Sequence, residues 1–130
     1  GGVVSAYAWD ILGGGFTQEP IQAEMRAIGL QPPRPPRADV SRLEALRALW
    51  TEAGLVDVTT REISVSRTFK DFEEFWTSNL SGNTGPMVAA LPPADGAALK
   101  ARVRARLPAD AQGRVTASAR ANAVKGRVSG

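Results

Sequence analysis

Residues 43–75 constrain the fold of this chain more than any other segment, because a helix pattern there runs directly into a strand pattern. The run LEALRALWTE places leucine, tryptophan and alanine at helical spacing, and Ala53-Gly54 then ends it, glycine being a common residue just past a helix end. Ser41 and Glu44 are spaced as a capping box at its start. The β-branched residues of 56–66 predict a long strand. A helix that feeds a strand in this way is typical of an α/β domain.

Two further strands are predicted near the ends of the chain. Residues 3–9, VVSAYAW, form a short and almost continuously apolar run, which predicts a strand covered on both faces. Residues 114–124 alternate between small apolar and polar side chains, which predicts a strand with a face of alanines. We expect residues 125–130 to be a tail.

Three more helices follow from spacing and caps. Residues 20–28 and 93–107 have apolar positions at helical intervals. Thr68 is placed to cap an aromatic helix that contains Phe69, Phe72, Phe75 and Trp76. Core packing is the better interpretation for at least Phe72 and Trp76, and the alternative is that part of this stripe lines an apolar cleft.

The remaining segments are predicted to be loops. The glycines of residues 13–15 lack the spacing of a phosphate-binding motif and predict a flexible loop that could cover a site. Residues 31–37, QPPRPPR, predict a stiff connector, and the alternative is a ligand for a partner's aromatic groove. Residues 81–86, SGNTGP, also predict a loop.

Composition excludes several functional classes. A length of 130 residues with 43% hydrophobic content predicts one globular domain, 1–130. The chain has no cysteine and no histidine, which removes the thiol nucleophile and the commonest general base and metal ligand, and with them most hydrolases and zinc enzymes, so no metal site is expected. A net charge of +3 does not by itself indicate a nucleic-acid surface. No apolar run reaches the roughly 20 residues that span a bilayer, and no signal peptide is recognisable, so a cytoplasmic protein is expected.

Four segments together resemble one family: GGVVSAYAWD at the start, LEALRALWTEAGLVDV, SRTFKDFEEFW and the terminal TASARANAVKG. Their order is similar to the C-terminal half of class I S-adenosylmethionine-dependent methyltransferases of the type 11 group, which act on small molecules. The resemblance implies the C-terminal part of a Rossmann-like sheet. In that arrangement residues 3–9, 56–66 and 114–124 form a three-stranded mixed sheet in the order first–third–second. The last strand is antiparallel and lies in the middle, and helices pack on the sheet.

The same resemblance implies that this chain is a fragment without the N-terminal, cofactor-binding half, and that only the intact parent is an active enzyme. The intact enzyme would use S-adenosylmethionine to methylate a small-molecule acceptor, whereas this chain would hold no cofactor-binding residue. The catalytic residues stay unknown. By analogy with the segments that cover the family's substrate pocket, the candidate pocket residues are Tyr7, Trp9, Asp10, Arg67, Phe69 and Phe72.

Two alternatives belong to other classes. One is a non-catalytic domain of the same fold that binds a small ligand or dimerises. The other is a weak nucleic-acid binder, which we give little weight because Lys100, Arg102, Arg104 and Arg106 are spaced as a solvated face without interleaved aromatics. We also expect the strand of residues 3–9 to expose an apolar edge that another chain could cover, forming a homo-oligomer.

Overall fold

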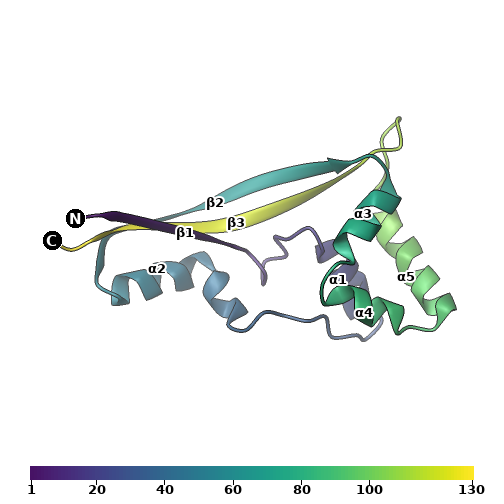
Figure 1. The fold of residues 1–130 in the computed structure, drawn as a ribbon, viewed down its shortest axis with the longest axis horizontal. Coiled ribbons are helices and arrows are strands. Elements are labelled where there is room, and N and C mark those ends of the chain that lie inside the picture. Colours follow the sequence, from purple (N-terminus) through teal and green to yellow (C-terminus); the bar gives the residue numbers. More distant parts are fainter. The chain divides into compact units, whose positions relative to one another are not determined.

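The computed structural model describes residues 1–130 as an α/β protein with three strands and packed helices (Figure 1). The strands are β1 (Val3–Trp9), β2 (Leu55–Phe69) and β3 (Val115–Val128). The helices are α1 (Glu19–Ala27), a 3-10 turn η1 (Ala38–Ser41), α2 (Leu43–Glu52), α3 (Phe72–Asn79), α4 (Thr84–Ala89) and α5 (Pro93–Arg106).

The sheet has the strand order β1-β3-β2, as predicted. Strand β1 pairs antiparallel with β3, with Val3 opposite Arg127 and Trp9 opposite Ala121. The mixed character that we expected is wrong, because the sheet is antiparallel and open. The central strand runs opposite to both neighbours, so β1 and β2 have the same direction but never pair with each other.

The chain divides into two compact units. We name the first the sheet unit; it comprises Gly1–Phe16, Arg34–Val65 and Ser118–Gly130. We name the second the helical unit; it comprises Thr17–Pro33 and Ser66–Ala117. Strands β2 and β3 contribute residues to both, and one boundary, between Pro33 and Arg34, falls inside the proline-rich segment.

The helical unit is built around an aromatic core. Phe75 is fully buried, and its ring lies 5.4 Å from that of Phe69 in an edge-to-face contact and 5.9 Å from that of Phe72. Trp76 stacks on Phe72 at 6.0 Å, so the core interpretation of these two residues is confirmed. The other core residues come from α1, α5 and β3: Ile21, Met25, Leu99, Val103, Val115 and Ala117.

Helix α3 begins later than predicted. Strand β2 continues to Phe69, and the hydroxyl of Thr68 bonds to that of Thr116 on β3 at 2.9 Å instead of capping a helix. Asp71 is the cap, because its carboxylate accepts a 2.8 Å bond from the Glu74 amide while Glu74 accepts one from the Lys70 amide at 2.7 Å. This is half of a capping box, because Glu74 reaches back to the amide of Lys70 and not to that of the cap residue Asp71.

Three other sequence expectations are corrected. Ser41 does not cap α2, because its hydroxyl donates to the Ala38 carbonyl inside η1 and Arg42 becomes the cap residue without a side-chain bond. The loop expected at residues 81–86 contains the start of α4. The tail expected from Lys125 instead continues β3 to Val128, because β1 offers it a partner as far as Val3.

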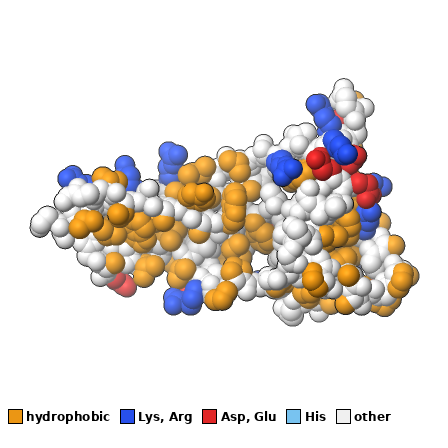
Figure 2. Space-filling view, in the orientation of Figure 1, with side chains coloured by type: hydrophobic (Ala, Val, Ile, Leu, Met, Phe, Trp, Pro, Cys, Tyr) orange, Lys and Arg blue, Asp and Glu red, His pale blue; other side chains and the backbone are white.

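The sheet unit has only one α-helix to cover its strands. Helix α2 lies along one face, where a side chain at Gly126 would meet Trp50 (Figure 1). Strand β1 is therefore exposed rather than covered on both faces, with Tyr7 73% and Trp9 44% accessible. Figure 2 shows hydrophobic side chains gathered over the strands of this unit. One edge of β1 has no neighbour in the sheet, as the sequence predicted.

A buried carboxylate organises the basic side chains of α5. Glu24 on α1 is 7% exposed and accepts hydrogen bonds from Arg102 at 2.7 Å and Arg106 at 2.5 Å. On another side of the helix, Lys100 and Arg104 both pair with Glu73. The four cations are thus two pairs at i,i+4 spacing, each sharing one carboxylate, and the three arginines remain exposed to solvent, as the predicted solvated face requires.

The Glu24 cluster should make stability depend on pH. The hydrogen bond from Arg106, followed by the bond from Arg102, holds the pKa of Glu24 below its ordinary value against the opposing effect of burial. A carboxyl group whose pKa is lower in the folded than in the unfolded state stabilises the fold at pH values above its unfolded pKa. This stabilisation is lost as the pH falls through the folded pKa. Glu24→Gln should lower the free energy of unfolding by about 1–2 kcal/mol near neutral pH. This value is in the lower part of the range for hydrogen bonds to charged groups, because both arginines are half exposed and solvent screens the ion pairs.

Urea denaturation from about pH 7 to about pH 3 measures this effect. The Glu24→Gln chain should lose less stability on acidification than the wild type. Asp95→Asn is the control, because Asp95 lies on α5 but makes no ion pair with the four cations, and this variant should respond to acid like the wild type. If Glu24→Gln and the wild type lost the same free energy of unfolding on acidification, the role of Glu24 would be contradicted.

Candidate functional site

The glycine loop after β1 is closed by its own hydrogen bonds. The Gly13 amide donates to the Asp10 carboxylate at 3.2 Å, the Gly14 amide to the Ile11 carbonyl at 3.3 Å, and the Gly15 amide to the Asp10 carbonyl at 2.8 Å. All three glycine N–H groups therefore have partners within the loop. A phosphate-binding loop needs free amides, so these bonds argue against that function.

An ion pair fastens the same loop to β3. The Arg120 guanidinium donates to Asp10 Oδ2 from Nη2 at 2.5 Å and from Nε at 3.1 Å, and to the Gly13 carbonyl at 3.0 Å. A Cβ on Gly15 would lie 2.7 Å from the Arg120 carbonyl oxygen, so only glycine allows this approach. These contacts argue against the flexible loop that the sequence predicted. Asp10, and to a smaller extent Glu62, raise the pKa of the Arg120 guanidinium.

A polar cavity of about 230 Å³ lies next to this ion pair, where β1 ends. Its charged and polar lining residues are Asp10, Arg42, Glu44, Glu62 and Asn122. The two glutamates and Arg42 are exposed and make no ion pair or side-chain hydrogen bond within the chain. The cavity is smaller than the roughly 300–1,000 Å³ of sites for drug-sized ligands, which suits a small head group.

Asn122 lines this cavity and has a buried acceptor without a partner. The residue is 2% exposed, and its Nδ2 donates a 2.7 Å bond to the Ser41 carbonyl. Because a carbonyl only accepts, this bond fixes which end of the amide is the nitrogen and leaves Oδ1 without a partner. An unpaired buried acceptor costs about 1–3 kcal/mol, so the burial of this amide lowers the stability of the fold.

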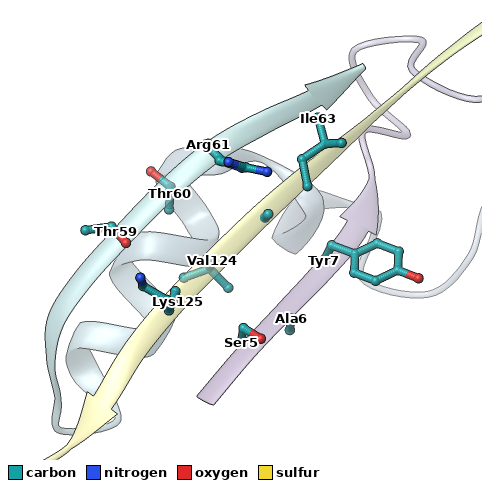
Figure 3. Close-up of a pocket in the computed structure, with 10 residues that line it drawn as sticks. Ser5, Ala6, Tyr7, Thr59, Thr60, Arg61, Ile63, Val124 and Lys125 are labelled. Carbon is teal, nitrogen blue, oxygen red and sulfur yellow. The ribbon is translucent and has the colours of Figure 1, made fainter. Parts of the chain in front are cut away.

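A larger pocket of about 730 Å³ lies on a face of the sheet (Figure 3). Ser5 is opposite Lys125 and Tyr7 is opposite Ala123, so these four side chains share one face. Arg61 and Ile63 of β2 complete the pocket, and α2 lies behind the sheet in this view. Its volume is in the range of small-molecule sites, but its wall is an uncovered sheet face.

The six candidate pocket residues fall into two groups. In the sheet unit, Tyr7 lines the large pocket, Trp9 ends β1, and Asp10 forms the ion pair and lines the small cavity. In the helical unit, Phe69 and Phe72 are buried in the core at 2% and 4% exposure. The Arg67 guanidinium lies 4.6 Å from the centre of the Phe69 ring.

Two residues of β3 were not among the predicted site residues: Asn122, which lines the small cavity, and Arg120, which forms the ion pair. The alternating pattern predicted both on the polar face of the strand. Ala121 and Asn122 are both buried, however, so the alternation changes phase at this point. The pairing register of β1 and β3 could have identified Arg120 as the partner of Asp10. Once β1 and β3 are antiparallel with Trp9 opposite Ala121, Asp10 comes opposite Arg120.

Two features are absent from the structure: a cluster of metal-ligating side chains and a helix that could span a membrane. No group of three or more histidine, cysteine, aspartate or glutamate side chains is placed to hold a metal ion. The longest helix, α5 with 14 residues, is too short and too charged to cross a bilayer, and the others are shorter still.

No protein-family model matches this chain, and no curated protein matches it either. The fold defines its class as an α/β protein with a three-stranded antiparallel open sheet.

Proposed function

We propose that this chain is the substrate-side portion of an S-adenosylmethionine-dependent methyltransferase that acts on a small molecule. The observation that carries the proposal is the position of β3, which runs antiparallel between β1 and β2. A last strand placed between the two preceding ones is the arrangement that the family resemblance implies. The exposed apolar β1 supports the proposal further, because in such an enzyme the cofactor-binding half would cover it.

The cofactor itself does not fit the residues of this chain. The glycine run of residues 13–15 has no free amide, and Asp10 and Arg120 occupy the space beside it. In this proposal the chain binds and orients the acceptor, and the parent enzyme's other half holds the cofactor. Positioning is the main requirement for such a transfer, which agrees with a chain that has no histidine or cysteine.

Three measurements test the proposal. Calorimetric titration of the 130-residue chain with S-adenosylmethionine should give no saturable binding. The coding sequence upstream of Gly1 should encode a strand, a glycine-rich turn and, about 20 residues later, an acidic residue. A protein extended by that segment should transfer labelled methyl groups to a small acceptor. Saturable cofactor binding by the short chain, or an upstream sequence without this motif, would contradict the proposal.

A dimerisation or small-ligand-binding domain is the second candidate, and the free edge of β1 favours it. Its seven residues, VVSAYAW, carry no charge that would discourage edge-to-edge pairing with a second copy. Light scattering over a range of concentrations separates the two functions. A stable dimer in the extended protein, together with no methyl transfer, would favour this candidate.

Nucleic-acid binding gains nothing from the structure. The four cations of α5 are engaged by Glu24 and Glu73, so they do not form a free basic row.

A further inference from the structure

We propose that the large pocket on the face of the sheet binds a small aromatic carboxylate. The pocket has a volume of about 730 Å³, and all of its lining residues belong to the sheet unit. That the bound carboxylate is also the methyl acceptor rests on the proposed function. Binding itself does not, because the lining is complete within this chain.

The register of β2 against β3 follows from two contacts. A Cβ on Gly126 would lie 3.5 Å from Cγ2 of Val58, and the hydroxyl of Thr68 bonds to that of Thr116. These pairs are ten residues apart on both strands, from 58 to 68 on β2 and from 116 to 126 on β3. The two strands therefore keep one register between these points.

This register gives the pocket a low floor between two higher walls. Ala123 of β3 has Tyr7 of β1 on one side and Arg61 of β2 on the other. One row further along the same face, Lys125 is opposite Ser5. Figure 3 shows Arg61 extending from β2 toward β3. A methyl group between longer side chains leaves room for a flat ring that lies along β3.

The charge of the pocket favours an anion. Arg61 and Lys125 are its charged lining residues, both are exposed, and neither forms an ion pair within the chain. Nearby carboxylates do not neutralise them, because Asp57 pairs with Arg127 and Glu62 lines the small cavity instead. The fork of a guanidinium matches a carboxylate and can bind it through two parallel hydrogen bonds.

The apolar lining favours an organic anion over an inorganic one. Tyr7 is 73% exposed, and Ala6, Ile63 and Val124 also line the pocket. An inorganic anion would leave this apolar surface in water, whereas an aromatic body would cover it. The face of an aromatic ring is in addition a favourable partner for a guanidinium.

A second copy of the chain fits this pocket less well. In a symmetric dimer formed through this face, the same patch would meet itself. The unpaired cations of the two copies, Arg61 and Lys125, would then share one interface, and like charges oppose association.

The test titrates the isotope-labelled chain with sodium 2-naphthoate and follows the ring signals of Tyr7, the one tyrosine of the chain, by NMR. Equal concentrations of sodium chloride correct for ionic strength. The signals should shift saturably. 2-Naphthamide, which has the same rings but no charge, should bind about tenfold more weakly because it lacks charge-assisted bonds. Acetate and 2-naphthylmethylammonium should give no saturable shift.

Matched variants place the site. Arg61→Gln and Lys125→Gln are exposed substitutions, and each should weaken 2-naphthoate binding about three- to tenfold. Arg127→Gln is the control, because it removes the same charge from β3 at a residue that lies outside the pocket and pairs with Asp57. It should bind like the wild type.

Several results would overturn the inference. These are Tyr7 signals that stay in place, equal affinity for 2-naphthamide, and unchanged affinity in both pocket variants. Tyr7 signals that shift with protein concentration alone would assign this face to a second copy and would overturn it too. None of these outcomes bears on the cofactor titration, so the two proposals fail separately.

Discussion

Phe75→Ala should lower the free energy of unfolding by about 3–5 kcal/mol, the range for removing a fully buried phenylalanine. Its side chain has no exposed surface, and it is the one ring that contacts both Phe69 and Phe72. Removing it leaves a cavity at the centre of the aromatic core that α1, α3, α5 and β3 share. Urea denaturation followed by far-UV circular dichroism measures the change.

Tyr7→Ala is the matched control, because it also removes an aromatic ring but from a site that is 73% exposed. We expect it to change stability by no more than about 0.5 kcal/mol. A loss of less than about 1 kcal/mol for Phe75→Ala would mean that the aromatic cluster is not the packed core described here, and would reopen the alternative that it lines a cleft.

The same substitution should have opposite effects at two helical glycines. A Cβ on Gly85, in α4, would overlap the carbonyl oxygen of Leu80, a backbone atom that cannot move aside. Gly85→Ala should therefore cost about 1–3 kcal/mol, the usual range for overpacking. Gly96, inside α5, has open space around its Cβ position, so Gly96→Ala should stabilise by about 0.5–1 kcal/mol because alanine favours the helix.

Thermal melts of both variants beside the wild type give the comparison directly. The expected order of melting temperature is Gly96→Ala, wild type, Gly85→Ala. Because each variant adds one methyl group to a glycine in a helix of the same unit, the difference in sign isolates the effect of the surrounding space. Stabilisation by both substitutions would show that Gly85 does not lie against Leu80 as described.

Elements that depend on local periodicity could be predicted from the sequence. Helix α2 ends at Glu52, just before the Ala53-Gly54 stop that its sequence indicated, and β3 has the alternating burial that its alanines predicted as far as Ala121. The burial of Phe72 and Trp76 followed from their four-residue spacing. These features arise from backbone geometry within a few residues, which the chain carries wherever it folds.

Element ends were less predictable. Thr68 and Ser41 are both good cap residues, but each hydroxyl found another partner, on β3 and in η1 respectively. A cap is decided by a competition between nearby partners, and the pairing of β2 with β3 changed that competition.

The small cavity was decided by tertiary structure alone. Asp10 was predicted as a site residue, but its partner Arg120 is 110 residues away and meets it only through the β1–β3 register. Asn122 looked solvent-facing until the alternation changed phase beside it and buried its amide against Ser41. Sequence patterns report which face of its own element a residue occupies. Which distant side chains meet there depends on strand order and register, and these are set by how the strands pair across the whole chain.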